Sequence, residues 1–283
     1  MTWHVALWVV YMSLAVVTLW SYWLAPAGTN TDYLQAIVYT VAPAIAVAGG
    51  LLTVKEYGIR SAAGRIFFTV TLGLIGWLCG EILWTYFDLV AKIDPFPSVA
   101  DWFYFLAYIP LCAGLIWQYY FLHKTVQTKL PYTLRLLLTM IAVLFSGIAL
   151  YFGVYKSIQP DYSLFENIVA MTYGVADIVL VLVGLVITIV TIEMRGGKFA
   201  AAWWWFLFGI FCTFLADISF AMFTPEYEGG MGYYRQALDT IWIIGYMAMG
   251  YGLGRFGWLV HGLRTRVEAQ KFENSQVDKT EKK

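Results

Sequence analysis

Long apolar runs constrain this chain more than any other feature of its sequence. A helix needs about 20 mostly apolar residues to cross the hydrocarbon core of a bilayer. Runs that meet this requirement are Trp3–Leu24, Tyr33–Val54, Arg65–Val90, Ala100–Leu122, Thr133–Val154, Ser163–Met194, Ala200–Thr224 and Tyr233–Leu263. We therefore expect an all-α, polytopic membrane protein with eight transmembrane helices.

The composition of the chain agrees with a bilayer as its surroundings. Of its 283 residues, 60% are hydrophobic and only 13% are charged, and the mean hydropathy is +0.67. Soluble domains carry roughly 25% charged residues. The 13 Trp, 20 Tyr and 19 Phe suit aromatic belts at the two membrane surfaces. The formal net charge is zero, so no nucleic-acid partner is indicated.

Basic residues concentrate in alternate loops and predict the orientation. The basic side is marked by Lys55, Arg60, Arg65, His123, Lys124, Lys129, Arg135, Arg195, Lys198, Arg264, Arg266 and Lys271. The other loops carry at most one basic residue each. Because cytoplasmic loops are rich in Lys and Arg, both termini should be cytoplasmic. The first run lacks a basic leader and a small-residue cleavage site, so we expect it to be a retained span.

The two halves of the chain resemble each other. YTVAPAIAVAGGL from Tyr39 aligns with YGVADIVLVLVGL from Tyr173, with an offset of 134 residues. Further matches pair Glu81 with Asp217, Asp101 with Asp239, Tyr108 with Tyr246, and Gly114 with Gly252, at offsets of 136 and 138. This pattern predicts a tandem 4+4 duplication with parallel repeats, the alternative being chance similarity between apolar helices. The repeats would span 1–128 and 129–263, followed by a charged cytoplasmic tail, 264–283, forming a short helix that frays.

Carboxylates within the apolar runs are the candidate site residues. A charge at the bilayer centre costs about 2.5–3.5 kcal/mol, so such groups normally face the bundle interior, a partner or water. Asp101, Tyr104 and Tyr108 share one helix face by their spacing, and Asp239, Trp242 and Tyr246 repeat that spacing. The predicted ligand-binding residues are Glu81, Trp84, Asp101, Tyr104, Tyr108, Asp177, Asp217, Arg235, Asp239, Trp242 and Tyr246.

The acids outnumber the basic groups near them, and this leaves two interpretations open. The only nearby cation on a span is Arg235, one turn before Asp239, so the acids are either protonated or meet a cationic ligand. A purely structural role is the alternative. Asp101 follows Ser98 at the start of a helix, where a carboxylate is favoured, and Glu81 and Asp217 can bridge helices through Tyr or Trp. Asp88 lies near the interface and can be solvated.

Signatures of catalysis are missing from the sequence. It contains no Ser-His-Asp arrangement, no HExxH and no glycine-rich phosphate motif. His4, His123 and His261 fall at predicted cytoplasmic helix ends, and no Lys occupies the interior of a run, which disfavours a Schiff base. Cys79, Cys112 and Cys212 form no CxxC pattern. We expect no enzymatic activity and no metal site, and the sequence identifies no cofactor.

The segment FPSVADWFYFLAY, Phe96 to Tyr108, resembles a P-S-x-A-D-x-x-Y motif of multi-spanning N-terminal sensor regions. These regions occur in bacterial and archaeal membrane signalling proteins such as diguanylate cyclases and histidine kinases. The resemblance rests on Pro97, Ser98, Ala100, Asp101 and Tyr104. It implies a sensory module in a prokaryotic cell membrane. No fused output domain follows, so the output would pass through a membrane or cytoplasmic partner.

These observations together favour a non-enzymatic membrane sensor or ligand-binding module. It would hold a small ligand in an outward-facing cavity lined by acidic and aromatic side chains, and would act through a partner protein. One alternative is a structural or accessory subunit of a larger membrane complex, with lipid or pigment on its aromatic surface. Another is a small-solute or cation transporter, which should show broken helices near the middle of the membrane.

Overall fold

Helices are the only regular secondary structure over the residues that the structure describes. The computed structural model describes residues 2–26, 28–125, 131–193, 197–229 and 233–281. Its α-helices are α1 (Thr2–Leu19), α2 (Asp32–Tyr57), α3 (Ala62–Thr85), α4 (Val99–Thr125), α5 (Tyr132–Ala149), α6 (Leu164–Glu193), α7 (Lys198–Met222), α8 (Thr224–Glu228) and α9 (Tyr234–Glu281). π-helical turns follow three of them, as η1 (Trp20–Leu24), η2 (Tyr86–Ala91) and η3 (Leu150–Tyr155).

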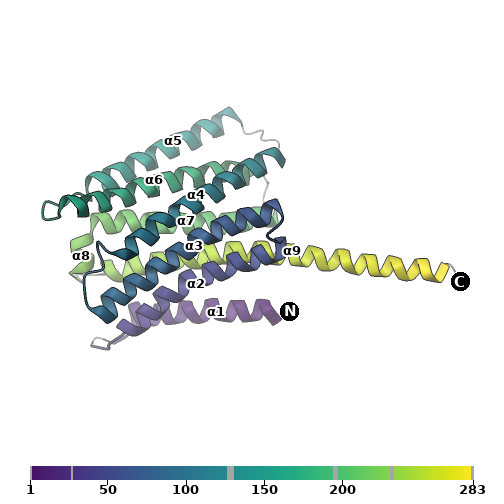
Figure 1. The fold of residues 1–283 in the computed structure, drawn as a ribbon, viewed down its shortest axis with the longest axis horizontal. Coiled ribbons are helices and arrows are strands. Elements are labelled where there is room, and N and C mark those ends of the chain that lie inside the picture. The colour runs from purple at the N-terminus through teal and green to yellow at the C-terminus, as the bar shows by residue number, and fades with distance from the viewer. Residues whose placement is uncertain (1, 27, 126–130, 194–196, 230–232, 282–283) are drawn as a thin grey trace.

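Six of the long helices form a closed ring. Going around it, α2 packs on α3, α3 on α4, α4 on α6, α6 on α7, α7 on α9, and α9 on α2. Outside the ring, α1 lies against α2 and α5 against α6, at opposite edges of the molecule (Figure 1). The chain starts and ends on the same side, and α9 runs far beyond the bundle there (Figure 1).

The structure confirms a membrane protein with six helices long and apolar enough to span a bilayer. These are Asp32–Tyr57, Ala62–Ala91, Val99–Lys124, Tyr132–Tyr155, Leu164–Ile189 and Lys198–Met222, among the described residues. The other two predicted spans are helical but do not meet that description. The side chains of the first are described only from Val9, and its apolar helix over these residues is Val9–Leu24. The eighth lies within α9, where tyrosines, glycines and Arg255 interrupt the apolar residues.

The tail does not form the short, fraying helix that the sequence predicted. It continues α9 without a break as far as Glu281. Residues 264–271 are exposed. A continuous helix needs no tertiary contact to satisfy its backbone, and the alternating Arg, Glu and Lys side chains here are compatible with that conformation.

Close helix packing in the ring depends on glycines. A Cβ on Gly73 of α3 would lie 2.8 Å from the carbonyl oxygen of Ala107 in α4. A Cβ on Gly209 of α7 would lie 2.5 Å from the carbonyl oxygen of Gly245 in α9, and one on Gly49 of α2 would lie 2.3 Å from that of Gly250. Any side chain at these positions would push two backbones apart, so the glycines fix how closely the ring closes.

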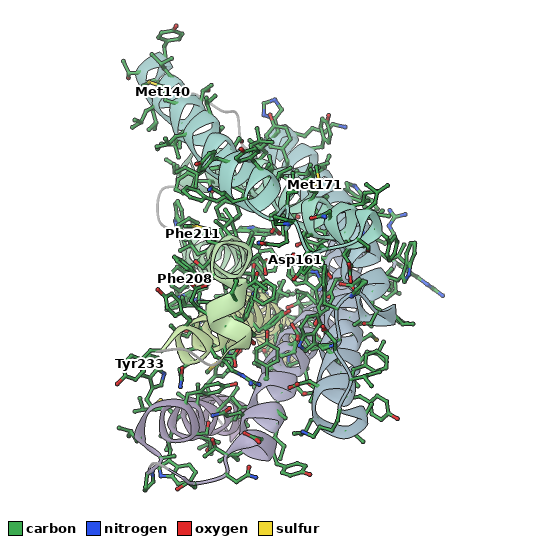
Figure 2. All side chains as sticks on the ribbon, turned by 90° about the vertical axis from the view of Figure 1, so that its left-hand side faces the viewer. Met140, Asp161, Met171, Phe208, Phe211 and Tyr233 are labelled. Atoms are coloured by element: carbon green, nitrogen blue, oxygen red, sulfur yellow. The ribbon has the colours of Figure 1, made fainter. Side chains whose placement is uncertain are left out.

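The ring is filled with aromatic side chains at the end where the termini lie. Phe67 of α3 and Trp203 of α7 stack across the ring with centroids 6.0 Å apart, and Phe256 of α9 contacts both rings. Outward-facing apolar residues such as Met140 and Phe208 are exposed, at 61% and 46%, and point away from the bundle (Figure 2). Apolar side chains on both faces of the same helices are what a lipid environment requires.

Candidate functional site

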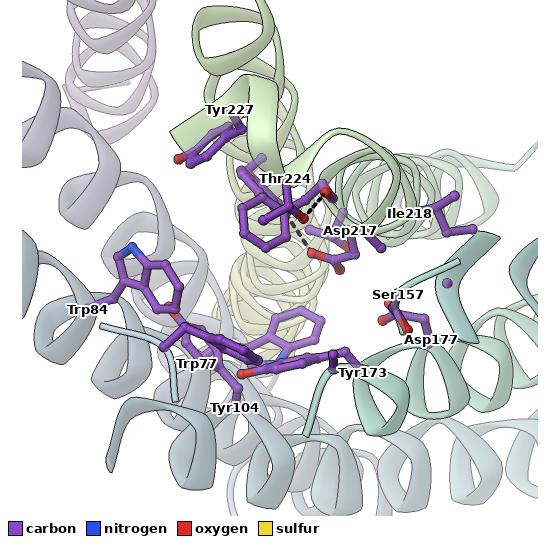
Figure 3. Close-up of a pocket in the computed structure, with 18 of the residues that line it drawn as sticks. Trp77, Trp84, Tyr104, Ser157, Tyr173, Asp177, Asp217, Ile218, Thr224 and Tyr227 are labelled. Carbon is purple, nitrogen blue, oxygen red and sulfur yellow. Dashed lines mark hydrogen bonds between the residues drawn. The ribbon is translucent and has the colours of Figure 1, made fainter. Parts of the chain in front are cut away.

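A cavity of about 140 Å³ lies inside the other end of the helix ring (Figure 3). One water molecule needs roughly 10–15 Å³ measured in this way, so the space suits a molecule larger than water. The cavity reaches Phe96, Gln159 and Tyr162, in the loops at the end of the bundle opposite the termini. Of the predicted site residues, it is lined by Glu81, Trp84, Tyr104, Tyr108, Asp177, Asp217, Trp242 and Tyr246.

Each carboxyl group that lines this cavity is hydrogen bonded to an aromatic residue on another helix. Tyr246 donates its hydroxyl to Oε1 of Glu81 at 2.7 Å, which links α9 to α3. Tyr108 donates to Oδ1 of Asp177 at 2.5 Å, which links α4 to α6. The indole Nε1 of Trp242 donates to Oδ1 of Asp217 at 2.8 Å. The predicted bridging through Tyr and Trp is therefore present.

The carboxyl groups differ in how far they open to the cavity. Glu81 and Asp177 are buried, at 4% and 3% exposed, whereas the Asp217 residue is partly exposed. Asp217 lies close enough to Asp177 and to Glu81 for their charges to repel one another. No Lys, Arg or His is among the described residues that line the cavity.

Asp101 lies inside the bundle but does not line the cavity. Its Oδ2 accepts from the backbone N–H of Ser98 at 2.6 Å, and the hydroxyl of Ser98 accepts from the N–H of Ala100 at 3.1 Å. This is a capping arrangement at the start of α4. Its Oδ1 accepts from the hydroxyl of Tyr173 in α6, whose ring does line the cavity. Asp101 thus fixes a helix start and one wall of the site.

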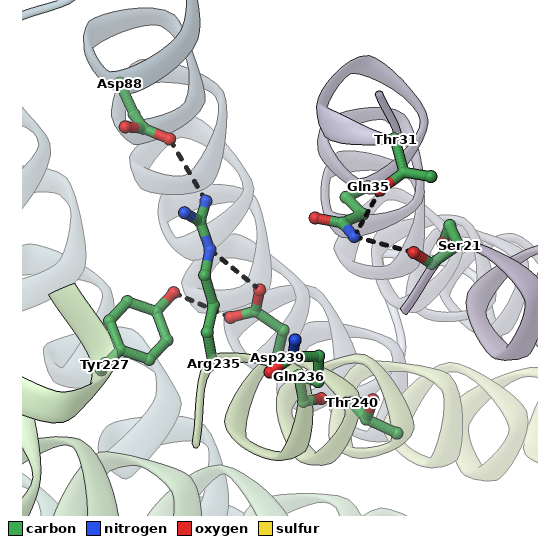
Figure 4. Close-up of polar contacts among 9 residues, drawn as sticks. All are labelled: Ser21, Thr31, Gln35, Asp88, Tyr227, Arg235, Gln236, Asp239 and Thr240. Carbon is green, nitrogen blue, oxygen red and sulfur yellow. Dashed lines mark hydrogen bonds and ion pairs between the residues drawn. The ribbon is translucent and has the colours of Figure 1, made fainter. Parts of the chain in front are cut away.

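A second cavity adjoins the first and is lined by the two remaining predicted residues, Arg235 and Asp239, whose polar contacts are drawn in Figure 4. Tyr39, Trp84 and Tyr227 line both cavities. Arg235 is 3.6 Å from Asp88 and 3.9 Å from Asp239, measured from guanidinium nitrogen to carboxylate oxygen.

Tyr227 of α8 contacts both Asp239 and Arg235 in the second cavity. It donates to Oδ1 of Asp239 at 2.8 Å, and the guanidinium of Arg235 lies 5.9 Å from the centre of its ring. Removal from bulk water raises the pKa of the Tyr227 hydroxyl well above its usual range, so it stays a hydrogen-bond donor. Arg235 does not line the first cavity and is held by Asp88, Asp239 and the ring of Tyr227.

Sequence reasoning missed several aromatic residues of the site. Tyr39, Trp77, Tyr173 and Tyr227 line the first cavity, and Trp77 packs edge-on against both Tyr108 and Tyr246. Tyr39 and Tyr173 carried a usable signal, because they occupy matched positions in the two halves. Trp77 carried none, because a lone aromatic residue in an apolar run is typical of any membrane helix, and Tyr227 carried none, because it lies in a polar segment between two runs.

The histidines are placed away from the cavity where the structure describes them. His261 faces Glu56 at 3.3 Å at the end of the bundle near the termini, and His123 stacks on Tyr119. The His4 side chain lies outside the described residues, and so does Lys129. No group of three or more His, Cys, Asp or Glu among the described side chains is arranged to hold a metal ion.

Replacing Asp101 should affect stability according to whether an acceptor remains. Asp101→Asn keeps one oxygen for Ser98 or Tyr173 and should cost less than about 1 kcal/mol. Asp101→Ala strands a buried hydroxyl and a helix N-terminus and should cost about 1–3 kcal/mol. Thermal unfolding of both variants in detergent measures the difference, and equal melting temperatures would contradict the capping role.

Comparison of the chain with known proteins found no relative. No protein-family model, curated protein or solved structure matches this chain. The arrangement of the cavity is therefore the basis for a functional proposal. The cavity is lined by aromatic side chains and three carboxyl groups, and it reaches the loops at one end of the bundle.

Proposed function

We propose that this chain is an eight-span membrane protein that binds a small ligand in the cavity at the outer end of its helix ring. It performs no chemistry itself and passes the binding event to a partner. The observation that carries the proposal is the cavity, whose aromatic walls and uncompensated carboxyl groups converge from α3, α4, α6, α7 and α9. Clefts with a few convergent polar groups on largely apolar walls are the usual form of small-molecule sites.

Packing supports counting the first and eighth runs as spans. Along the ring, α9 packs on α2 and α7, which are both candidate spans, and so shares their environment. Helix α1 lies beside α2, and Trp23 of η1 donates to Thr240 of α9 at 3.0 Å. With eight spans, both termini fall on one side.

Matched contacts in the two halves support the 4+4 duplication. The contact of Gly73 with Ala107 and Leu111 corresponds to that of Gly209 with Gly245 and Met249, at offsets of 136 and 138 residues. Gly73 and Gly209 were not among the matched residues from which these offsets follow. Sequence similarity by chance would not reproduce the same crossing contact in both helix pairs.

A second crossing point repeats in the same way. A Cβ on Gly114 would lie 3.0 Å from the backbone nitrogen of Val70, and one on Gly252 would lie 2.7 Å from that of Phe206. The stacked pair Phe67 and Trp203 are matched residues that face each other, as expected beside a two-fold axis. The cavity then lies between the repeats, where duplicated membrane proteins commonly bind small molecules.

Continuous helices favour a binding module over a transporter. Transport would predict interrupted helices near the middle of the membrane. Pro43 lies inside α2, and Pro110 lies inside α4, yet both helices run unbroken through the described residues. The resemblance of the Phe96–Tyr108 segment to sensor regions points the same way. The exposed part of α9 beyond Leu263 is the segment we assign to the partner.

The orientation gives a direct prediction. A reporter that is active only in the cytoplasm, fused after Lys283, should be active, because the basic residues Lys55, Arg60, Arg65, Lys124 and Lys198 lie at the same end of the bundle as the C-terminus. Activity confined to an exported reporter fused at the same point would reverse the orientation and turn the cavity inward.

Native mass spectrometry on protein extracted gently from its own membrane tests the binding function. Wild-type protein should carry a small molecule that Ala221→Phe lacks, because Ala221 lines the cavity and the added ring would fill it. Ala15→Phe places the same ring on the exposed surface of α1 and should retain the ligand. An identical adduct pattern, or no adduct, on all three proteins would contradict a ligand site in this cavity.

A further inference from the structure

We infer that the ligand is a small organic ammonium ion, and that its binding displaces a proton from Asp217. This inference rests on the proposed binding function and specifies its ligand. It follows from three properties of the cavity taken together: its aromatic walls, its three carboxyl groups and the lack of a basic side chain among its described lining residues.

The aromatic walls suit a cation with organic substituents. Trp77, Trp84 and Trp242 line the cavity together with several tyrosine rings. The faces of Trp and Tyr rings attract ammonium groups, and the attraction is strongest where water is excluded. A bare metal ion would need several oxygen ligands at short distances, and no metal-binding cluster is present among the described side chains. An alkylammonium head can use both the rings and the carboxylates.

The carboxyl groups of the cavity can be balanced by a positive charge on the ligand. The carboxyl groups that face it are Glu81 from α3, Asp177 from α6 and Asp217 from α7. The hydroxyl-bearing side chains that line it are Tyr39, Tyr104, Tyr108, Ser157, Tyr162, Tyr173, Thr213, Thr224, Tyr227 and Tyr246. Farther out, Arg235 is shared between Asp88 and Asp239, and Asp101 is held by Ser98 and Tyr173. Lys92 lines the second cavity, and no Lys, Arg or His is among the described residues that line the first.

Neighbouring carboxyl groups cannot all stay ionised where no cation balances their charge. Without a bound ligand, at least one of these three carboxyl groups therefore carries a proton. Asp217 is the group placed to exchange one. Of the three residues it is the most exposed, and its Oδ1 accepts a hydrogen bond from the indole of Trp242. When the ammonium ion enters, the O–H bond of the Asp217 carboxyl breaks and the proton leaves to water. The carboxylate then pairs with the ammonium, so the net charge of the site is unchanged.

Choline and 3,3-dimethylbutan-1-ol form a matched pair of probes, since they share shape and hydroxyl group and differ in the charge of the head. Isothermal titration of the protein in nanodiscs, in two buffers of different ionisation enthalpy, reports affinity and proton release together. We expect choline to bind at least about tenfold more tightly than the alcohol and to release close to one proton per site. Asp217→Asn should abolish proton release and weaken choline binding about tenfold or more.

Asp161→Asn is the control, because Asp161 is an exposed loop residue (Figure 2) that is not itself among the residues lining the cavity. It should bind choline as the wild type does, with the same proton release. Equal affinity for choline and the alcohol, or no binding of choline by folded protein, would overturn the ammonium ligand. Choline binding without proton release would contradict the displacement of a proton from Asp217. A native adduct on wild type, absent from Ala221→Phe, would in each case leave the binding function standing.

Discussion

Gly49→Leu should prevent the helix ring from closing. A Cβ at this position would lie 2.3 Å from the carbonyl oxygen of Gly250 and 3.2 Å from the backbone nitrogen of Gly254. Overpacking a core usually costs about 1–3 kcal/mol, and here the atoms that would have to move are backbone of the facing helix, so we expect more than about 3 kcal/mol. Size-exclusion chromatography in mild detergent should show little monodisperse protein.

Gly147→Leu is the matched control for this change. Gly147 is also a helical glycine within a candidate span, but nothing lies within 4 Å of where its Cβ would be. This variant should elute and melt as the wild type does, or slightly better, since Leu favours helix over Gly. Normal elution of Gly49→Leu beside it would mean that α2 and α9 do not pack as closely as described.

Glu81→Ala should be the most damaging change of a polar residue in the cavity. Glu81 is 4% exposed and accepts a hydrogen bond from the hydroxyl of Tyr246 across the helix ring. Its loss would leave that hydroxyl without this acceptor and would leave a void. We expect a loss of about 2–4 kcal/mol in the free energy of unfolding. Glu81→Gln keeps the shape and an acceptor and should lose less than about 1 kcal/mol.

Thermal or denaturant unfolding of the two Glu81 variants separates the contributions of shape and charge. Tyr246→Phe adds a third point, because it removes only the hydroxyl and leaves the buried carboxyl group without that donor. It should fall between the other two. If Glu81→Gln were as unstable as Glu81→Ala, an ionised Glu81 would be required for folding, which is at odds with a cavity whose described lining residues include no basic side chain.

The helices followed from local hydropathy, which is why they were predictable. The predicted run Tyr33–Val54 became α2, Asp32–Tyr57, and Ala200–Thr224 became α7, Lys198–Met222. A membrane span must satisfy its backbone internally, so a long apolar run has almost no alternative to a helix. Whether the eighth run spans the membrane is less evident from hydropathy. Its glycines allow close packing and its tyrosines form hydrogen bonds, and both lower the mean hydropathy of α9.

The hydrogen-bond partners of the acids could not be predicted, because they depend on which helices meet. Spacing placed Tyr108 on the same face as Asp101, yet Tyr108 donates to Asp177 and Asp101 accepts from Tyr173. Both pairings cross from α4 to α6. The repeat alone pointed to Tyr173, through its match with Tyr39, while Arg235 and Asp239 proved to belong to the adjoining cavity.

A density map of the protein extracted gently from its native membrane, with a bound antibody fragment to aid alignment, tests the cavity as a ligand site most directly. We predict density for a small molecule between Trp77, Trp242 and Asp217, with α1 and α5 outside a ring of six helices. A ring that has collapsed onto itself, or a cavity filled by a side chain of a partner subunit, would contradict the account.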